Sequence, residues 1–369
     1  MRKTIFALAC AAVALFATSC VTDDPSPCAE CEDQEAIEFR DGFVRGADIS
    51  WYTEMEADGK KFYNSKAQER TCPVLMTEIG MQAARFRVWV NPQNKFCDFC
   101  DTKDVVAKAV AAKEAGLDVM IDFHYSDWWA DPGRQDKPKA WEGLGQAELQ
   151  SALAAHTTSV LQSLKNAGVS PKWIQIGNET NSGMVFPDGQ LWNSDGDIPG
   201  GWRNFTNLYN AGYDAAKAVF PSAKIMPHLA NAYQDNAWWF ERLKENGGKF
   251  DMIALSHYPM GTSGKTWQEM NAAAIANIKA LKAEFGVDVM VSEIGVPAAD
   301  PATGNLAITD FLEKANAETA CAGVFYWEPE VYGNWKPSSY DKFSPTWNAY
   351  PNGAFTVTGR PSAILNAFR

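Results

Sequence analysis

The sequence lacks the marks of several large classes of protein. It has only 4 His, none in a His-x-His pair, which disfavours metal-dependent hydrolysis. No Gly-x-Ser-x-Gly motif supports a serine nucleophile, and the glycine fingerprints of dinucleotide-binding folds are absent. No cluster of Lys or Arg follows the first few residues, and the formal net charge is −12. This charge argues against nucleic acid as a partner.

What is present describes a large folded domain. Hydrophobic residues make up 46% and charged residues 21% of 369 residues, which suits one large α/β barrel or two medium domains. Aromatic residues reach 12%, with 14 Trp. In an acidic protein, so many Trp side chains suggest surfaces on which planar or sugar-ring ligands stack, besides those that fill a core.

The amino terminus has the features of an export signal. Two basic residues precede an apolar run, 5–16, that is too short to span a membrane, and three small residues then precede Cys20. This pattern resembles a bacterial lipobox. We therefore predict a lipoprotein signal peptide over 1–19, lipid attachment at Cys20, an acidic tether over 20–40 and one folded domain over 41–369. A plain secretion signal cut near the same place is the alternative.

The expected location follows from that signal. An exported lipoprotein is held at a membrane by its lipid anchor, and the acidic pair Asp23-Asp24 resembles a signal that sends some lipoproteins to the outer face. We expect an outer-membrane protein on the cell surface. The face of the membrane that carries the anchor is left open.

Cysteines in an exported chain favour disulfides over metal. Beyond Cys10 and Cys20, six thiols remain, two pairs of them in Cys-x-x-Cys spacing: Cys28, Cys31, Cys72, Cys97, Cys100 and Cys321. A four-thiolate zinc site from the two pairs is conceivable, but one pair lies in the tether. Disulfides are the favoured state, with connectivity that spacing does not decide.

Short apolar strands alternate with helical segments from Gly46 onward. The predicted strands are Gly46–Ser50, Ala83–Val90, Leu117–Phe123, Lys172–Asn178, Lys224–Leu229, Met252–His257, Val287–Glu293 and Gly323–Glu328. The predicted helices are Asp104–Ala115, Gln146–Ala167, Asn204–Phe220, Trp238–Asn246, Thr266–Phe285 and Asn305–Ala320. Eight strands with helical crossovers predict a single (β/α)₈ TIM barrel rather than a doubly wound sheet.

Two of these strands end on a carboxylate, Glu179 and Glu293. In a parallel barrel such residues stand at the rim where loops build a site, and two acids from different strands can face each other across a cleft. Retaining glycoside hydrolysis needs such a pair, one acid as nucleophile and one as proton donor, roughly 5–5.5 Å apart. The alternative is that both are ordinary rim acids that form salt bridges or cap helices.

Other strand ends carry groups that suit this chemistry. They are Asp48, Arg87, His124, Asn178, His257, Tyr258, Trp327 and Glu328. Arg87 and Tyr258 could hold the nucleophile ionised, and Asn178 could bind the sugar 2-hydroxyl. Trp327 offers a flat floor for a sugar ring. Long, aromatic loops over 125–145 and 180–202 would form the groove.

The chain resembles glycoside hydrolase family 53, the arabinogalactan endo-β-1,4-galactanases, from Gly46 to about Trp335. The motifs that carry the resemblance are Gly46-Ala47-Asp48-Ile49-Ser50, Arg85-Phe86-Arg87-Val88-Trp89-Val90-Asn91-Pro92, His124-Tyr125-Ser126-Asp127-Trp128-Trp129-Ala130-Asp131-Pro132, Gly177-Asn178-Glu179-Thr180, Ser256-His257-Tyr258-Pro259, Ser292-Glu293 and Tyr326-Trp327-Glu328-Pro329. The Asn-Glu and Ser-Glu elements mark only the wider clan. The arginine-rich and His-Tyr-Ser-Asp motifs are much more specific.

The resemblance implies roles for individual residues. Glu179 would be the acid/base and Glu293 the nucleophile. The cleaving subsite would be lined by Arg87, His124, Asn178, Tyr258 and Trp327. Four further residues would contact sugar or support the loop: Asp48, Asp127, Trp129 and Asp131. The substrate would be β-1,4-galactan in the (arabino)galactan side chains of pectin, cut by an endo-acting, retaining monomer.

The chain also departs from the family pattern. Trp128 stands where a Thr usually precedes the loop Trp, and Val185-Phe186 replace a Leu-Trp. Product length and branch tolerance are therefore open. No cofactor is required and no metal is assigned. A structural calcium, common in bacterial relatives, is possible, but the sequence shows no acidic calcium loop.

Two alternatives stay open beside the galactanase. One is a retaining endoglycanase of the same clan that acts on another β-1,4-glycan. The other is a non-catalytic glycan-binding lipoprotein on the cell surface. For the galactanase we expect a raised pKa for Glu179, a lowered one for Glu293 through Arg87, and a bell-shaped rate with a mildly acidic optimum.

Overall fold

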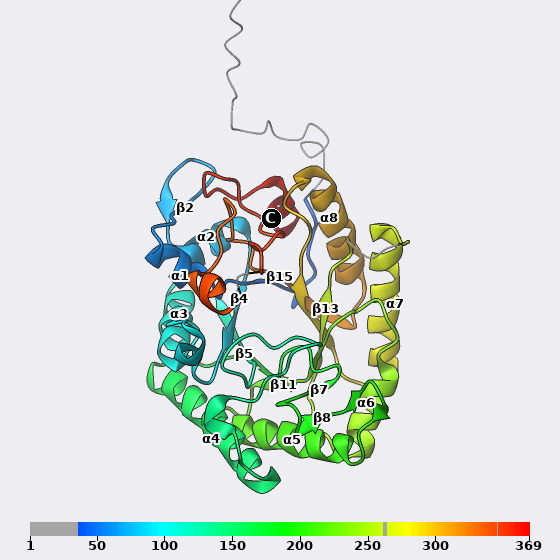
Figure 1. Cartoon of the computed structure of the whole chain (residues 1–369). Helices are drawn as coiled ribbons and strands as arrows, with labels where there is room; N and C mark the ends of the chain where they lie inside the picture. Colours follow the sequence, from blue (N-terminus) through cyan, green and yellow to red (C-terminus); the bar gives the residue numbers. More distant parts are fainter. Residues whose placement is uncertain (1–35, 261–263, 345) are drawn as a thin grey trace, which may run out of the picture.

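The computed structural model describes residues 36–260, 264–344 and 346–369. Within them, nine strands form one parallel sheet in the order β11-β6-β5-β4-β1-β15-β14-β13-β12. The strands are β1 (Val44–Asp48), β4 (Ala83–Val88), β5 (Asp118–Phe123), β6 (Trp173–Ile176), β11 (Lys224–Met226), β12 (His228–Leu229), β13 (Ile253–His257), β14 (Val289–Ile294) and β15 (Cys321–Trp327). Helices surround this sheet (Figure 1).

The sheet closes into an eight-stranded barrel. β11 and β12, the two ends of the strand order, are one strand of the chain that is interrupted at Pro227, because proline has no N–H to give to the ladder. β11 pairs with β6 and β12 pairs with β13, so the ring is complete. The predicted (β/α)₈ barrel and its eight strands are confirmed.

The helices are α1 (Tyr52–Ala57), α2 (Cys72–Ile79), α3 (Thr102–Glu114), α4 (Gln146–Asn166), α5 (Gly201–Val219), α6 (Ala237–Glu245), α7 (Trp267–Phe285), α8 (Pro301–Ala317) and α9 (Ser338–Phe343). All six predicted helices are present; α1, α2 and α9 were missed. These three are only six to eight residues long, too short for a clear amphipathic period.

Three short hairpins were also missed. They are β2 (Phe62–Tyr63) with β3 (Glu69–Arg70), β7 (Gly183–Met184) with β8 (Gly189–Gln190), and β9 (Trp192–Asn193) with β10 (Gly196–Asp197). Each strand has two residues, which leaves no alternation to detect. β7 to β10 lie in the long loop between β6 and α5, where the sequence predicted part of a groove.

The barrel interior is layered because side chains alternate along each strand. At the amino-terminal end of the strands, an apolar cluster closes the barrel: Ala83, Met120, Trp173, Met226, Met252, Ala254, Met290 and Phe325. Gly46 belongs to this layer, and a Cβ there would lie 2.4 Å from the ring of Phe325. The floor is therefore packed, so a ligand site must lie nearer the carboxyl ends.

The next layer is polar although it is buried. Two residues further along their strands lie Asp48, Arg85, Asp122, Gln175, His228 and Ser256, each at most 1% exposed. Buried polar groups must bond to one another, since the unpaired groups would lose their hydration without replacement. A charged layer above an apolar floor is the platform on which the site stands.

The predicted signal peptide, Cys20, and residues 20–35 of the predicted tether lie outside the described residues. Within the described part of the chain, no helix is both long and apolar enough to cross a bilayer. The cysteine prediction is wrong for the four thiols in that part: Cys72, Cys97, Cys100 and Cys321 are free. Each lies buried among core side chains, at most 3% exposed.

Candidate active site

The two predicted carboxylates reach the barrel interior by different local irregularities, and Glu293 does so through a β-bulge. On β14, Met290 points to the floor while Val289 and Val291 pack outward. Regular alternation would turn residue 293 outward. Instead, Leu255 pairs with Val291 and the next residue of β13 pairs with Glu293, so β14 contains one extra residue. The bulge restores the inward direction of the Glu293 carboxylate.

Glu179 is placed by a break at the end of β6. The strand ends at Ile176, and Gly177 follows with φ +87°, where a Cβ would lie 2.5 Å from Thr180. Glu179 itself has φ +46°, a conformation that costs energy for any residue except glycine. Such strain is typical of functional positions. Here the turn directs the side chain of Asn178 to Arg85 and places Glu179 near Glu293, whose charge raises the pKa of Glu179.

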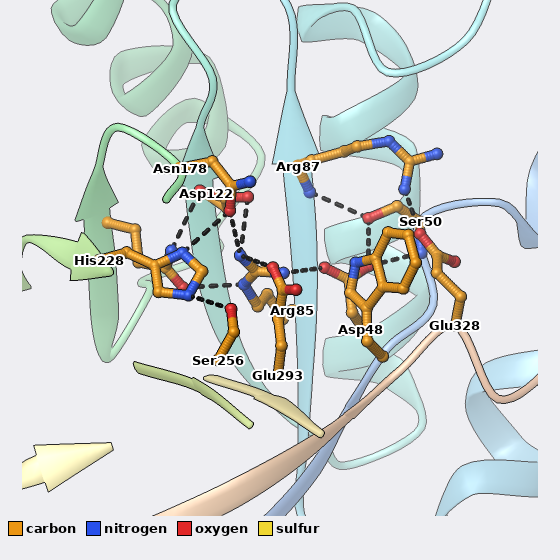
Figure 2. A network of polar contacts seen from close by, with 12 residues as sticks. Asp48, Ser50, Arg85, Arg87, Asp122, Asn178, His228, Ser256, Glu293 and Glu328 are labelled. Carbon is orange, nitrogen blue, oxygen red and sulfur yellow. Dashed lines mark hydrogen bonds and ion pairs between the residues drawn. The ribbon is translucent and has the colours of Figure 1, made fainter. Parts of the chain in front are cut away.

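Arg85 is the hub of the polar layer (Figure 2). Its Nη1 lies 2.7 Å from Asp48, and its Nη2 lies 2.9 Å from both Asp122 and the Oε1 of Glu293. Its Nε donates to Gln175 at 2.8 Å, and Nη2 also donates to Asn178 at 2.9 Å. One guanidinium thus joins five strands or strand ends and fixes the predicted nucleophile.

The predicted contact between Arg87 and Glu293 is wrong. Arg87 forms its ion pair with Glu328, and its guanidinium lies 4.2 Å from the ring centroid of Trp129. Both arginines point inward because they are two residues apart on β4, but Arg87 stands one layer higher and nearer β1 and β15. The alternation of side chains indicates two inward arginines and does not say which one meets Glu293.

A second set of contacts surrounds the two acids. The hydroxyl of Tyr258 donates to Glu293 Oε2 at 2.9 Å. The hydroxyl of Ser256 lies 2.8 Å from Nε2 of His228, and the backbone N–H of Glu179 donates to Nδ1 of the same ring at 3.3 Å. His228 Nδ1 in turn lies 2.9 Å from the Asn178 Oδ1 that also accepts from Arg85. Figure 2 shows Asn178, His228 and Ser256 on one side of Arg85, with Ser50 and Glu328 on the other.

The pKa values of the two carboxyl groups are both raised. For Glu179, burial raises the pKa to about 8, and the negative charge of Glu293 contributes in the same direction. For Glu293, burial raises the pKa to about 7, although Arg85 and the Tyr258 hydrogen bond act against it. The expected lowering for Glu293 is therefore wrong, because burial outweighs the guanidinium. Glu179 still holds its proton to higher pH than Glu293.

His124 and Asn178 are held by the barrel. His124 Nδ1 accepts from the indole of Trp89 at 3.2 Å and from the backbone of Ala130 at 3.1 Å, so its Nε2 carries the proton and donates to Asp122 at 3.0 Å. The amide of Asn178 donates to the carbonyl of Ala130 at 2.8 Å. One N–H of that amide remains for the sugar hydroxyl that the sequence assigned to it.

Three of the predicted acids have structural contacts. Asp48 is fully buried; besides Arg85 it bonds Ser50 Oγ at 2.5 Å. Asp127 accepts from Asn94 at 2.8 Å and from the backbone of Lys139 at 3.0 Å, which fastens the loop after β5. Asp131 accepts from Gly133 at 2.8 Å, and its charge reaches Glu179. Asp48 and Asp127 are thus buried supports.

The predicted tryptophans gather on the side of the barrel near β1 and β15. Trp129 and Trp327 lie 5.9 Å apart between ring centroids, and both contact Trp51, at 5.4 and 5.7 Å. Trp327 is half-buried, while Trp129 is 7% exposed. Trp327, the predicted floor for a sugar ring, thus lies next to Trp51 and Trp129, the rings that pack against Arg87.

Sequence reasoning missed Arg85, Asp122, Gln175, His228 and Ser256. All five belong to the polar layer two residues above the floor. The signal for them was a polar residue at an inward position within a buried strand, whereas the predicted site residues stand at or just beyond the strand ends. Among the described residues, no group of three or more His, Cys, Asp or Glu is placed to hold a metal ion.

Comparison with known proteins gives concordant matches. The family model described as Glycosyl hydrolase family 53 matches residues 44–369. The arabinogalactan endo-beta-1,4-galactanase of Cellvibrio japonicus is 30% identical over 357 residues, 88% of this chain and 89% of that protein. The endo-beta-1,4-galactanase of Bacillus subtilis is 28% identical over 341 residues, 84% of this chain and 75% of that protein.

Solved structures agree. The GH53 catalytic domain of Ignisphaera aggregans has a TM-score of 0.77 at 27% identity, covering 91% of this chain and 98% of that one. A structure from work on two fungal beta-1,4-galactanases has a TM-score of 0.74 at 27% identity, covering 88% and 98%.

Proposed function

The chain belongs to glycosyl hydrolase family 53, and from this we propose that it is an endo-acting β-1,4-galactanase that cleaves (arabino)galactan side chains of pectin with retention. The observation that carries the proposal is the pair of acids. Glu293 on β14 bonds Arg85, and Glu179, three residues past the end of β6, lies where burial and the charge of Glu293 both raise its pKa; the Glu179 backbone N–H donates to His228 Nδ1 at 3.3 Å. The relatives named above are galactanases, which supports the substrate.

The family points to a double displacement, and the contacts of the two acids fit its two roles. The ionised carboxylate of Glu293, oriented by Arg85 and Tyr258, attacks the anomeric carbon while protonated Glu179 gives its proton to the departing oxygen. The glycosyl ester on Glu293 is then hydrolysed by a water that loses its proton to Glu179. The higher pKa of Glu179 matches its role as acid, because it is still protonated when Glu293 has ionised.

Product analysis on linear β-1,4-galactan tests this function. Wild type should release short galacto-oligosaccharides whose newly formed ends first appear in the β configuration, as NMR of the early products would show. Glu293→Gln should lose nearly all activity. On an aryl β-galactobioside whose phenolate leaves without a proton, Glu179→Ala should form a β-glycosyl azide when azide is added, because a small anionic nucleophile needs no base.

Glu328→Gln is the matched control for these variants. Glu328 is also a buried acid at the end of a barrel strand, but it pairs with Arg87 rather than with the reacting groups. It should keep most of the activity. If Glu293→Gln hydrolysed galactan at the wild-type rate, the mechanism would be wrong. Hydrolysis of mannan, xylan or glucan in preference to galactan would favour another glycanase of the clan. Binding of galactan without the formation of new reducing ends would favour a non-catalytic glycan-binding protein.

We also propose that the chain is exported and anchored by lipid at Cys20 on the cell surface. The apolar run before Cys20, the small residues beside it and the acidic stretch after it support the proposal. Labelled palmitate should enter wild type and not Cys20→Ser, which should leave the membrane fraction. Protease added to intact cells separates the two faces, because only a surface protein is cut.

A further inference from the structure

A group of tryptophans on the outer rim takes no part in the site described above. Trp192, Trp202 and Trp238 form what we call the rim platform. Trp238 contacts Trp192 at 5.8 Å and Trp202 at 6.4 Å between ring centroids, and Trp192 contacts Trp202 at 6.5 Å. Trp202 is buried, Trp192 half-buried, and Trp238 48% exposed. Of the 14 Trp in the sequence, all within the described residues, only Trp238 is exposed.

The rim platform is fixed to the loop that carries Glu179. Trp192 lies in that loop, in the hairpin of β9 and β10, and Trp202 is at the start of α5 where the loop ends. From α6, the indole of Trp239 donates to the carbonyl of Asn181 at 2.9 Å, two residues beyond Glu179. Asn181 is itself bonded to the backbone of Ala230 after β12. The platform and the predicted acid therefore belong to one rigid part of the rim.

This position determines which part of a substrate could reach the rim platform. A general acid stands beside the departing oxygen, so the leaving-group half of a polysaccharide lies on the side of Glu179. Trp51, just after β1, and Trp327, on β15, lie across the barrel from β12 and β6, while Trp129 belongs to the loop after β5 and contacts both. The rim platform is thus on the leaving-group side.

We propose that Trp238, supported by Trp192, stacks against a sugar ring of the leaving-group half of the galactan chain, beyond the ring next to the cleaved bond. This inference rests on the proposed function. β-Galactose suits such a surface because its axial 4-hydroxyl leaves the hydrogens of C3, C4 and C5 together on the opposite face. An indole offers the matching flat apolar surface.

The surroundings of Trp238 favour a sugar over a protein partner. The exposed neighbours in the hairpin and the loop before α6 are polar: Asn193, Asp195, Asp197, Gln234 and Asp235. Such groups can bond hydroxyls at the edge of a stacked ring. Within the described residues, the other exposed large hydrophobic side chains are Val74, Phe96 and Val357, which belong to other segments, so no broad apolar patch surrounds Trp238.

The test compares a long substrate with a short one. On linear galactan, Trp238→Ala should lower kcat/KM about three- to tenfold, mainly through KM, because one aromatic stacking contact is lost. On an aryl β-glycoside of galactobiose, whose leaving group ends at the first position past the cleaved bond, the variant should equal wild type. Trp238→Tyr should recover most of the activity on galactan. Phe96→Ala, a matched exposed aromatic 59% accessible, should change neither substrate.

Binding provides a readout without turnover. In the inactive Glu293→Gln background, calorimetry with galactan should show a three- to tenfold weaker affinity when Trp238→Ala is added. An equal loss on both substrates would overturn the inference, since Trp238 would then act through the Glu179 loop. So would an unchanged KM and affinity, or a wild-type dimer in solution that Trp238→Ala dissociates. If wild type released nothing from galactan, the proposed function would fail instead.

Discussion

The two inward arginines of β4 lie in successive layers of the same barrel and have opposite surroundings. Arg85 bonds three carboxylates and two amides, and every one of its nitrogens is used. Arg87 has one carboxylate and three indole rings around it, at 4.2, 5.0 and 5.1 Å to the centroids, and its Nε and Nη2 have no partner. Arg85 thus positions Glu293, whereas Arg87, two residues further along the strand, packs among aromatic rings.

The difference lies in what each guanidinium can influence. Arg85 touches Glu293, so its loss changes the charge and position of the predicted nucleophile. Arg87 touches Glu328, whose pKa burial raises to about 7 despite the guanidinium. Glu328 lies beside Glu330, a second buried acid whose pKa burial and Glu328 raise well above its usual value. The Arg87–Glu328 ion pair is therefore buried and is not bonded to Glu293.

Arg85→Lys should produce the largest effect. A lysine keeps the charge but cannot make the five directed bonds of a guanidinium, so Glu293 loses its orientation. We expect kcat on galactan to fall about a hundred- to a thousandfold. The control is Arg87→Lys, which should fall less than tenfold. Steady-state kinetics on galactan measures both variants. Equal losses of kcat would show that the two arginines do not differ in their roles.

Arg87→Leu should mainly affect folding. Removing the cation leaves Glu328 buried without its partner, a change that typically costs about 3–5 kcal/mol. Urea unfolding at pH 7 measures the free energy of unfolding, and the folded fraction should retain kcat within about tenfold. A stable but inactive Arg87→Leu would show that this ion pair takes part in catalysis.

Tyr258→Phe should change the pH profile. The Tyr258 hydroxyl lowers the pKa of Glu293 against burial, so its removal should move the acidic limb of kcat/KM to higher pH and lower kcat about tenfold. In wild type the two limbs should lie near 7 for Glu293 and 8 for Glu179, which places the optimum at neutral rather than mildly acidic pH. Tyr332→Phe, whose hydroxyl bonds the Lys61 carbonyl, should leave the profile unchanged.

The smallest expected effect concerns stability: Glu179→Gln, although it removes the proposed acid, should make the folded state more stable. The pKa of Glu179 rises from 4.5 to about 8 on folding, so the folded state resists ionisation and wild type loses stability as pH rises between these values. The amide has no such loss. Its melting temperature should match that of wild type near pH 4.5 and exceed it at pH 8. At pH 8 its free energy of unfolding should be higher by roughly 1 kcal/mol or more. Glu114→Gln on the surface of α3 should show no such divergence, and a constant difference across pH would contradict the argument.

The sequence was sufficient for the barrel because long apolar strands and capped helices repeat clearly. It also named both acids, since each ends a strand. It could not show that Glu293 points inward, because the bulge in β14 depends on pairing with β13 and β15. Nor could it show which arginine contacts Glu293, because Arg85 and Arg87 are two residues apart on one strand and both point inward. Pairing across strands, rather than pattern along one strand, decided these points.

The crowding of three carboxylates around Arg85 has a consequence for the reaction cycle. Asp48 and Asp122 already more than match the single positive charge before Glu293 ionises, and both push the pKa of Glu293 upward. Once a sugar is esterified to Glu293, that oxygen no longer carries charge and the surplus of negative charge around Arg85 is smaller by one unit. The covalent form of the enzyme is thus electrostatically relaxed compared with the resting one, and an enzyme trapped with a slow-leaving fluorosugar should melt at a higher temperature than the free enzyme.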